Sequence, residues 1–154
     1  MPTITTFLTY ANQAEEAVRF YLSTFEDGRI VSTMPGPNGT VMSLTFELFG
    51  QRFIAMNGGP AFTFAQGISL FVACDTQAEI DRFWSNLSDG GKEIQCGWVT
   101  DRFGVTWQII PKVLPTLLGD KDPARSGRAL QAMLAMKKLD IAALERAANG
   151  DGGS

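Results

Sequence analysis

The residues with the greatest chemical capacity in this sequence gather in one short stretch, residues 96–111. The stretch contains a thiol, two indoles, an adjacent carboxylate and guanidinium, and an amide: Cys96, Trp98, Asp101, Arg102, Trp107 and Gln108. Apolar strand-like patterns lie on both sides of a turn at residues 101–104, which predicts a β-hairpin. We expect this hairpin to line a pocket, because its side chains can stack on a ligand, donate hydrogen bonds and pair with charge.

The sequence contains no histidine, and this absence excludes much familiar chemistry. Without imidazole there is no histidine general base, no Ser-His or Cys-His nucleophile pair and no ordinary His-bearing catalytic zinc site. Cys74 and Cys96 are far apart and form no Cys-x-x-Cys pair, so we expect reduced thiols that behave as small buried hydrophobes. Nucleophilic catalysis by Cys96 is disfavoured.

The polar and aromatic side chains of the hairpin each have a structural and a functional interpretation. On a strand, Gln108 shares a face with Thr106 and Ile110, where its amide either binds a ligand or satisfies neighbouring backbone. Trp107 lies on the opposite face, and we expect it in the core. Trp98 either stacks on a ligand or anchors a dimer contact.

The charged residues are less easily assigned. Asp101 stands in a turn, where an aspartate commonly makes local hydrogen bonds, and we favour this structural role. The alternative hypothesis is that Arg102 binds an anionic ligand while Asp101 fixes its guanidinium. Glu47 and Glu93 are candidate acids or bases, but strand alternation does not assign their faces without a register.

Charge and hydropathy exclude several classes of partner. Thirteen Lys and Arg residues against sixteen Asp and Glu give a formal net charge of -3 without a basic run, so we expect neither nucleic acid nor an anionic membrane as a partner. No segment reaches about 18 consecutive apolar residues, and the first residues lack a signal-peptide pattern. We therefore expect a cytoplasmic protein.

Two copies of one strand–helix–strands unit organise most of the chain. The expected strands are residues 4–10, 29–34, 41–49, 52–57, 68–74, 92–98 and 105–110. Helices follow Asn12 and Thr76, each of which stands three residues before a glutamate with the spacing of a capping box. The helix segments 16–21 and 79–84 are similar at an offset of 63 residues, which indicates an internal repeat.

The last part of the chain, from residue 113, has a helical pattern without strands. Asp122 and Pro123 predict the start of a helix that runs to about Lys138, and Asp140 predicts the cap of a last helix through Ala148. We expect these helices to pack on the body of the protein or on a partner chain. Residues 149–154 have the composition of a frayed tail.

Three segments carry a resemblance to a known family: residues 49–60 (Phe49-Gly50-Gln51-Arg52-Phe53-Ile54-Ala55-Met56-Asn57-Gly58-Gly59-Pro60), residues 69–74, and residues 96–98 with 101–108. In these segments, and in its helical tail, the chain resembles the vicinal oxygen chelate superfamily (glyoxalase/bleomycin resistance/dioxygenase) and its PhnB-like, demethylubiquinone-methyltransferase-like family. The resemblance implies an α+β fold in which two βαβββ modules, residues 1–62 and 63–112, form a curved mixed sheet around a cleft. A helical extension and tail, residues 113–154, and a homodimer are also implied. A two-module ferredoxin-like α+β dimer is the alternative fold.

Metal-dependent members of that superfamily take ligands from the first and last strands of each module, usually His and Glu. On this sequence the corresponding positions fall at about Thr5, at Ile54 to Met56, at Ser69 and at Gln108. Hydroxyl, amide and aliphatic side chains hold a divalent ion weakly. We therefore expect no metal and no cofactor.

The resulting hypothesis is a metal-independent small-molecule binding protein with an unidentified ligand. Its candidate ligand-binding residues are Gln108, Trp98, Arg102, Asp101, Ser69, Met56 and Thr5. Further apolar side chains that can line a cleft are Met34, Met42, Phe46, Phe62, Phe64 and Phe71. The alternatives are an enzyme that uses carboxylates or an unidentified cofactor, and a literal methyltransferase, which we discount because no glycine-rich loop joins a strand to a helix. Whether a reaction is catalysed stays open.

Overall fold

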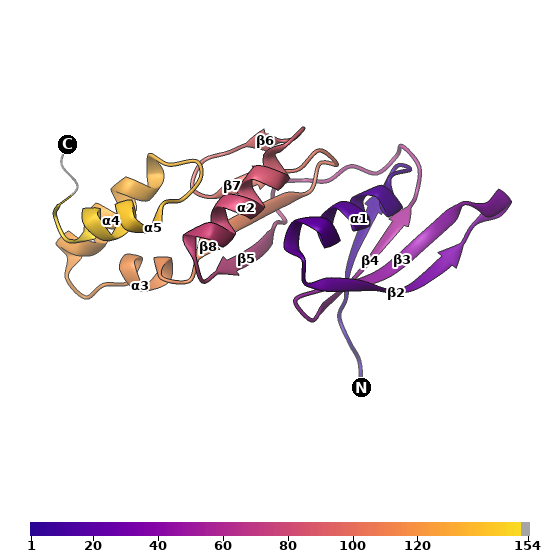
Figure 1. The fold of residues 1–154 in the computed structure, drawn as a ribbon, viewed down its shortest axis with the longest axis horizontal. Helices are drawn as coiled ribbons and strands as arrows, with labels where there is room; N and C mark the ends of the chain where they lie inside the picture. Colours follow the sequence, from indigo (N-terminus) through magenta and orange to yellow (C-terminus); the bar gives the residue numbers. More distant parts are fainter. Residues whose placement is uncertain (152–154) are drawn as a thin grey trace. The chain divides into compact units, whose positions relative to one another are not determined.

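The computed structural model describes residues 1–151, so residues 152–154 of the predicted tail lie outside the described part. The chain forms two compact units, Met1–Phe64 and the part from Ala65 onward. Each unit contains one four-stranded mixed sheet with a helix over one face (Figure 1). The predicted α+β class with two repeated modules is therefore confirmed.

The first unit pairs a sheet with one amphipathic helix. Its elements are β1 (Thr6–Tyr10), α1 (Ala14–Phe25), β2 (Gly28–Pro35), the 3₁₀ turn η1 (Pro37–Gly39), β3 (Val41–Leu48) and β4 (Gln51–Asn57). The strand order is β1-β4-β3-β2, with β1 parallel to β4 and the other pairs antiparallel. Helix α1 packs on the face that carries Tyr10 and Phe46: the hydroxyls of Tyr10 and Tyr21 are 2.9 Å apart, and the rings of Tyr21 and Phe46 stack at 6.4 Å.

The start of α1 differs from the predicted capping box. The N-cap residue is Gln13, without a side-chain cap, and Asn12 is exposed. Asn57, at the end of β4, provides the cap instead, because its Oδ1 accepts a 2.8 Å hydrogen bond from the backbone N–H of Ala14. Its Nδ2 donates to the carbonyl of Val41 at 3.0 Å. One amide therefore joins the helix start to β3 and β4.

The second unit repeats this topology and adds the extension. Its elements are β5 (Leu70–Cys74), α2 (Gln77–Ser88), β6 (Lys92–Glu93), β7 (Trp98–Thr100), β8 (Thr106–Pro111), α3 (Leu114–Leu118), α4 (Pro123–Leu134) and α5 (Ile141–Ala148). The strand order β5-β8-β7-β6 matches that of the first sheet position by position. The predicted capping box of α2 is confirmed, since Thr76 Oγ1 accepts from Glu79 N–H at 3.2 Å and Glu79 Oε1 accepts from Thr76 N–H at 3.0 Å.

The predicted strand at residues 92–98 is interrupted. Cys96 and Gly97 adopt left-handed backbone conformations, with φ of 63° and 83°, so β6 ends early and β7 begins only at Trp98. The N–H groups of Cys96 and Gly97 donate to the carbonyls of Met136 and Lys137, each at 2.8 Å. The chain therefore leaves the sheet here in order to bind the extension.

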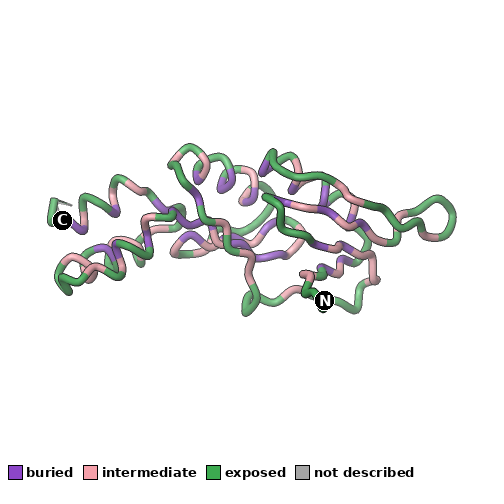
Figure 2. The backbone as a smooth tube through the Cα atoms, turned by 90° about the horizontal axis from the view of Figure 1, so that it is seen from below, coloured by how far each residue is buried: buried purple, intermediate pink, exposed green. Residues whose placement is uncertain are grey.

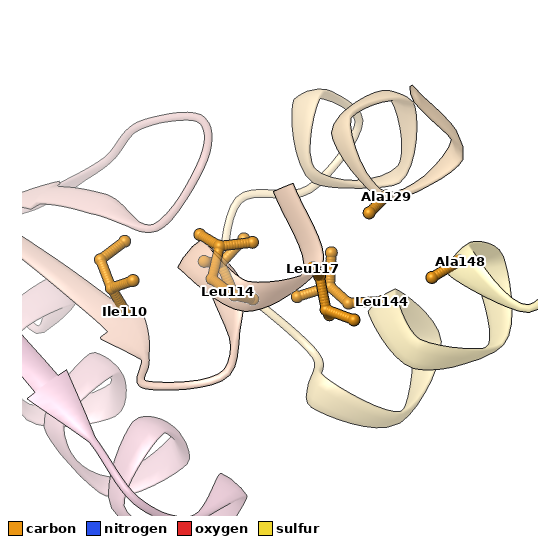
Figure 3. Close-up of a cluster of buried hydrophobic side chains, with 7 residues drawn as sticks. Ile110, Leu114, Leu117, Ala129, Leu144 and Ala148 are labelled. Atoms are coloured by element: carbon orange, nitrogen blue, oxygen red, sulfur yellow. The ribbon is translucent and has the colours of Figure 1, made fainter. Parts of the chain in front are cut away.

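The helical extension packs on the second unit. Packing on the body of the protein was the first of the two arrangements expected from the sequence. Ile110 of β8 belongs to one cluster of buried apolar side chains with Leu114, Leu117 and Leu144; in Figure 3, Leu114 is drawn between Ile110 and the other two. Gln77 of α2 adds a two-point link, because its Nε2 donates to the carbonyl of Leu139 and its Oε1 accepts from Ile141 N–H. The long helix ends at Leu134, earlier than predicted.

Figure 2 shows buried and less buried positions interspersed along the backbone. In β3 burial alternates strictly, since every second residue from Leu44 to Leu48 is buried, and the two faces of its sheet therefore differ. We call the face that points away from α1 or α2 the distal face of its sheet. Within residues 1–151, no helix has the length and apolar character needed to cross a membrane.

Candidate ligand-binding site

The hairpin of β7 and β8 is held by the carboxylate of Asp101, which is only 3% exposed. One oxygen, Oδ1, accepts hydrogen bonds from the N–H groups of Phe103 at 2.9 Å and Val105 at 3.1 Å. The other, Oδ2, accepts from the indole Nε1 of Trp107 at 2.8 Å. The favoured structural role of Asp101 thus has a complete geometric basis.

Trp107 occupies the core as predicted, with 2% of its surface exposed. Arg102 is exposed on the same turn, and its guanidinium approaches the carboxylate of Asp89 at 3.4 Å. The hypothesis that Arg102 binds an anionic ligand remains a prediction.

Gln108 lies on the distal face of the second sheet, in the middle of a row of three side chains. The strand register places Phe71 of β5 on one side of Gln108 and Trp98 of β7 on the other. Gln108 Nε2 donates a 2.9 Å hydrogen bond to Ser69 Oγ, just before β5. Two predicted site residues, Ser69 and Gln108, are therefore in direct contact, and Trp98 is their neighbour.

On the face of β8 that carries Gln108, the two neighbouring side chains, Thr106 and Ile110, are closed to solvent. Thr106 is 2% exposed, and its hydroxyl lies 2.9 Å from that of Thr100. Ile110 is 4% exposed because the extension covers it. Gln108 is half-buried, and Phe71 is 57% exposed. Around Gln108 the row Phe71–Gln108–Trp98 is thus accessible, and Ala73 and Lys92 are further exposed positions of this face.

From the sequence, Phe71 is only one of several apolar side chains that can line a cleft. It follows Ser69 by two residues in the predicted strand 68–74, and alternation along a strand places the two on one face. Phe46, from the same group, is fully buried beneath α1 and is a core residue. The spacing from Ser69 was the available signal for separating them.

The remaining predicted site residues belong to the first unit. Met56 lies on β4 between Thr9 and Ser43, on the distal face of that sheet. Thr5 directly precedes β1 and is half-buried.

The register resolves the faces of the two candidate glutamates. Glu47 is on the distal face of the first sheet, where it accepts from Arg52 at 2.9 Å and pairs with Arg29 at 3.4 Å. The hydrogen bond from Arg52, assisted by the charge of Arg29, lowers the pKa of Glu47. Glu93 pairs with the buried Val99 and accepts from the indole of Trp84 at 2.7 Å, so it faces α2.

Cys74 is buried, and burial raises the pKa of its thiol to about 12. A thiol with this pKa is protonated at neutral pH and is a poor nucleophile. Cys96 has its backbone bound by the extension, as described above. Burial agrees with the predicted packing role of Cys74, whereas Cys96 is only half-buried.

The donor set does not fit a divalent metal. Ser69 and Gln108 offer one hydroxyl and one amide, already bonded to each other, and Thr5 and Met56 offer a hydroxyl and a thioether. None of these groups is anionic or an imidazole, and a set of neutral groups alone holds a divalent ion weakly. Within residues 1–151, no group of three or more His, Cys, Asp or Glu side chains is close enough to hold a metal ion.

Two βαβββ modules with matching strand order, and a distal face that carries the polar row, define a protein of the vicinal oxygen chelate superfamily. The chain belongs to its 3-demethylubiquinone-9 3-methyltransferase family, the PhnB-like group, whose sequence profile matches residues 2–110.

Solved structures agree with this assignment. A PhnB protein from Bacillus cereus is 35% identical, with a TM-score of 0.67, and the match covers 71% of this chain and 99% of that one. A Pseudomonas aeruginosa protein has the same fold at 21% identity, with a TM-score of 0.59 and coverage of 73% and 98%. The fosfomycin resistance protein FosX from Mesorhizobium loti has it at 14% identity, with a TM-score of 0.51 and coverage of 69% and 87%. No curated protein sequence matches the chain.

Proposed function

We propose that this chain is a metal-independent small-molecule binding protein. The observation that carries the proposal is the hydrogen bond between Ser69 and Gln108. The resemblance places metal ligands of catalytic relatives at these two positions, and here a neutral pair satisfies itself. A distal face with an exposed phenylalanine, a half-buried tryptophan and a partly satisfied amide offers stacking and hydrogen bonding to an organic ligand.

The carboxylate form of the enzymatic alternative uses general acid–base catalysis, which is most efficient when the pKa of the acid or base lies near the working pH. Of the two glutamates considered, Glu93 faces α2, and Glu47 has a lowered pKa because of Arg52 and Arg29. Glu47 therefore stays ionised at neutral pH and is a weak proton acceptor. This argues for binding over carboxylate catalysis.

The family name refers to methyl transfer, but the residues do not fit a nucleotide-type cofactor. Such cofactors bind at a glycine-rich turn from a strand to a helix in a doubly wound parallel sheet. The corresponding connections here are residues 11–13 and 75–76, which contain no glycine, and both sheets are mixed. Binding of S-adenosylmethionine to the purified protein would revive the methyltransferase alternative.

A thermal-shift screen over metabolites and antibiotics tests the proposal directly. A ligand that binds only the folded state, at 100 times its Kd, stabilises it by about 2.7 kcal/mol. We expect at least one compound to raise Tm without being consumed. Stoichiometric Fe, Mn, Ni or Zn in the purified protein would contradict metal independence.

The assembly and the organisation of the chain belong to the same proposal. We expect a cytoplasmic homodimer in which residues 1–62 and 63–112 bind the ligand and residues 113–154 support the second module. Light scattering of the purified protein should give the mass of two chains, and a mass of one chain would remove the dimer from the proposal.

A further inference from the structure

The row on the distal face of the second sheet narrows the chemical class of ligand. We propose that the row Phe71–Gln108–Trp98 binds a flat, uncharged, conjugated ring whose edge carries both a hydrogen-bond donor and an acceptor. This inference rests on the proposed function and adds to it the nature of the ligand.

The first argument is the spacing of the two aromatic side chains. Phe71 and Trp98 are the direct partners of Gln108 on β5 and β7, so two strand spacings, about 9.6 Å, separate their backbones. A ring in van der Waals contact on both faces needs about 7–8 Å between its neighbours. A flat ring that stands over Gln108 can therefore stack on Phe71 and on Trp98, whereas a bulky saturated ring meets them with less contact.

The second argument is the unused hydrogen-bonding capacity of Gln108. A primary amide has two donor hydrogens and one acceptor oxygen. One hydrogen of Nε2 is used by Ser69. Within residues 1–151, the side chain of Gln108 has no other hydrogen bond, which leaves Oε1 and one N–H of a half-buried group. A ligand edge with one donor and one acceptor, as in a lactam, matches these two atoms.

The third argument is charge. The row and the flanking threonines, Thr100 and Thr106, are all uncharged, and Ile110 closes the far side with apolar surface. The register places the charged side chain of Lys92 on this face as well, beside Thr100 on the edge strand β6, outside the row. A charged group that loses water here gains no opposite charge from these side chains, so its binding is penalised. The part of the ligand that contacts the row is therefore neutral.

Three small probes separate these contributions. 2-Quinolone has a flat bicyclic ring with a lactam edge, 1-methyl-2-quinolone has the same ring without the donor, and 2-piperidone has the lactam edge without the flat ring. Binding of each probe to the full-length protein is measured by ligand-observed NMR titration. We expect 2-quinolone to bind best and each of the other probes to bind about tenfold more weakly, the size of one net hydrogen bond or one stacking contact.

Variants assign the effect to the row. Gln108→Leu should remove the preference for 2-quinolone over 1-methyl-2-quinolone, and Trp98→Leu should weaken both quinolones. Gln51→Leu, an exposed amide in the first unit, is the matched control and should bind all three probes like the wild type. Urea midpoints establish whether each variant is folded. If Gln108→Leu does not fold, it is replaced by Gln108→Asn, whose amide is carried on a shorter side chain.

The outcomes distinguish this inference from the proposed function. Absence of 2-quinolone binding, equal binding of the two quinolones, or a preference that persists in Gln108→Leu would overturn the ligand class. The proposed function would then still stand if another compound of the thermal-shift screen stabilises the protein. The proposed function is overturned separately if no compound of the screen stabilises the protein and a stoichiometric metal is found.

Discussion

The indole Nε1 of Trp107 donates a 2.8 Å hydrogen bond to the carboxylate of Asp101, across the turn that joins β7 to β8. Trp107 is a core residue and Asp101 is a turn residue, so this one contact fixes the turn to the interior of the second unit. The same carboxylate accepts two backbone N–H groups. The position of Gln108, next to Trp107 on β8, therefore depends on a charged group that does not face the proposed ligand row.

Replacement of Asp101 by alanine should strongly reduce stability. It leaves three donors without their acceptor, and each buried unsatisfied group costs about 1–3 kcal/mol, so we expect a loss of about 3 kcal/mol or more. Arg102→Ala is the control at the next position and should change the free energy of unfolding by less than about 1 kcal/mol, because its ion pair with Asp89 is exposed. Urea denaturation of both variants checks this, and equal losses would disprove it.

Asn57 should be more important for stability than Asn12, although the sequence pattern indicates the opposite. Asn57→Ala removes the cap of α1 and the link to Val41, and we expect a loss of about 1–2 kcal/mol. Asn12→Ala should change stability by less than about 0.5 kcal/mol, because Asn12 is exposed and is not the cap. A loss in Asn12→Ala as large as that in Asn57→Ala would refute the assignment.

The two capping boxes show how far local rules reach. Thr76 with Glu79 and Asn12 with Glu15 have the same spacing, yet only the first forms. The reason is a tertiary competitor, since the end of β4 brings Asn57 to the first N–H of α1. A pattern of neighbouring residues contains no information about a side chain more than 40 positions away, so this cap was not predictable.

The candidate site was predictable in residue type but not in geometry. Alternation along a strand correctly separated Gln108 from Trp107, and the register then placed Trp98 and Phe71 beside Gln108. The faces of Glu47 and Glu93 required that register as well. The break at Cys96 and Gly97 depends on carbonyl groups of the extension, about 40 residues later, and strand propensity does not report it.

Cys74 should be unreactive in the folded protein. With a pKa of about 12, roughly one thiol in ten thousand is ionised at pH 8, whereas an unperturbed thiol reacts readily there. The partly exposed Cys96 gives an internal comparison: iodoacetamide should modify the native Cys74→Ala variant rapidly and the native Cys96→Ala variant slowly. Rapid modification of both variants would contradict the burial of Cys74.

The same pKa predicts an alkaline loss of stability. The thiolate is favoured in the unfolded chain, where the ordinary value is 9.0, and disfavoured in the folded protein. The contribution of Cys74 is therefore fully present below about pH 9 and decreases as the pH rises toward 12. Urea midpoints compared between wild type and Cys74→Ala should converge over this interval, and parallel pH profiles would argue against the shift.

Gly97→Ala and Gly127→Ala, both in the second unit, should change the free energy of unfolding in opposite directions. Gly97 has a φ of +83°, and a Cβ there would lie 2.9 Å from the carbonyl oxygen of Ile109 and 3.0 Å from Leu139 Cδ1. Gly97→Ala should cost about 2 kcal/mol or more through the left-handed backbone and the displaced extension. Gly127 lies inside α4 with open space around its Cα, so Gly127→Ala should add about 0.5–1 kcal/mol.

Hydrogen exchange separates a local effect of Gly97→Ala from a general one. If the clash with Leu139 displaces the extension, amides of residues 135–141 should exchange faster in this variant while those of α1, in the first unit, keep the wild-type rate. Gly127→Ala should leave both regions unchanged, because its side chain touches neither. Uniformly faster exchange in Gly97→Ala would mean that the loss of stability is global. The substitution would then not act through the contact between the β6–β7 break and the extension.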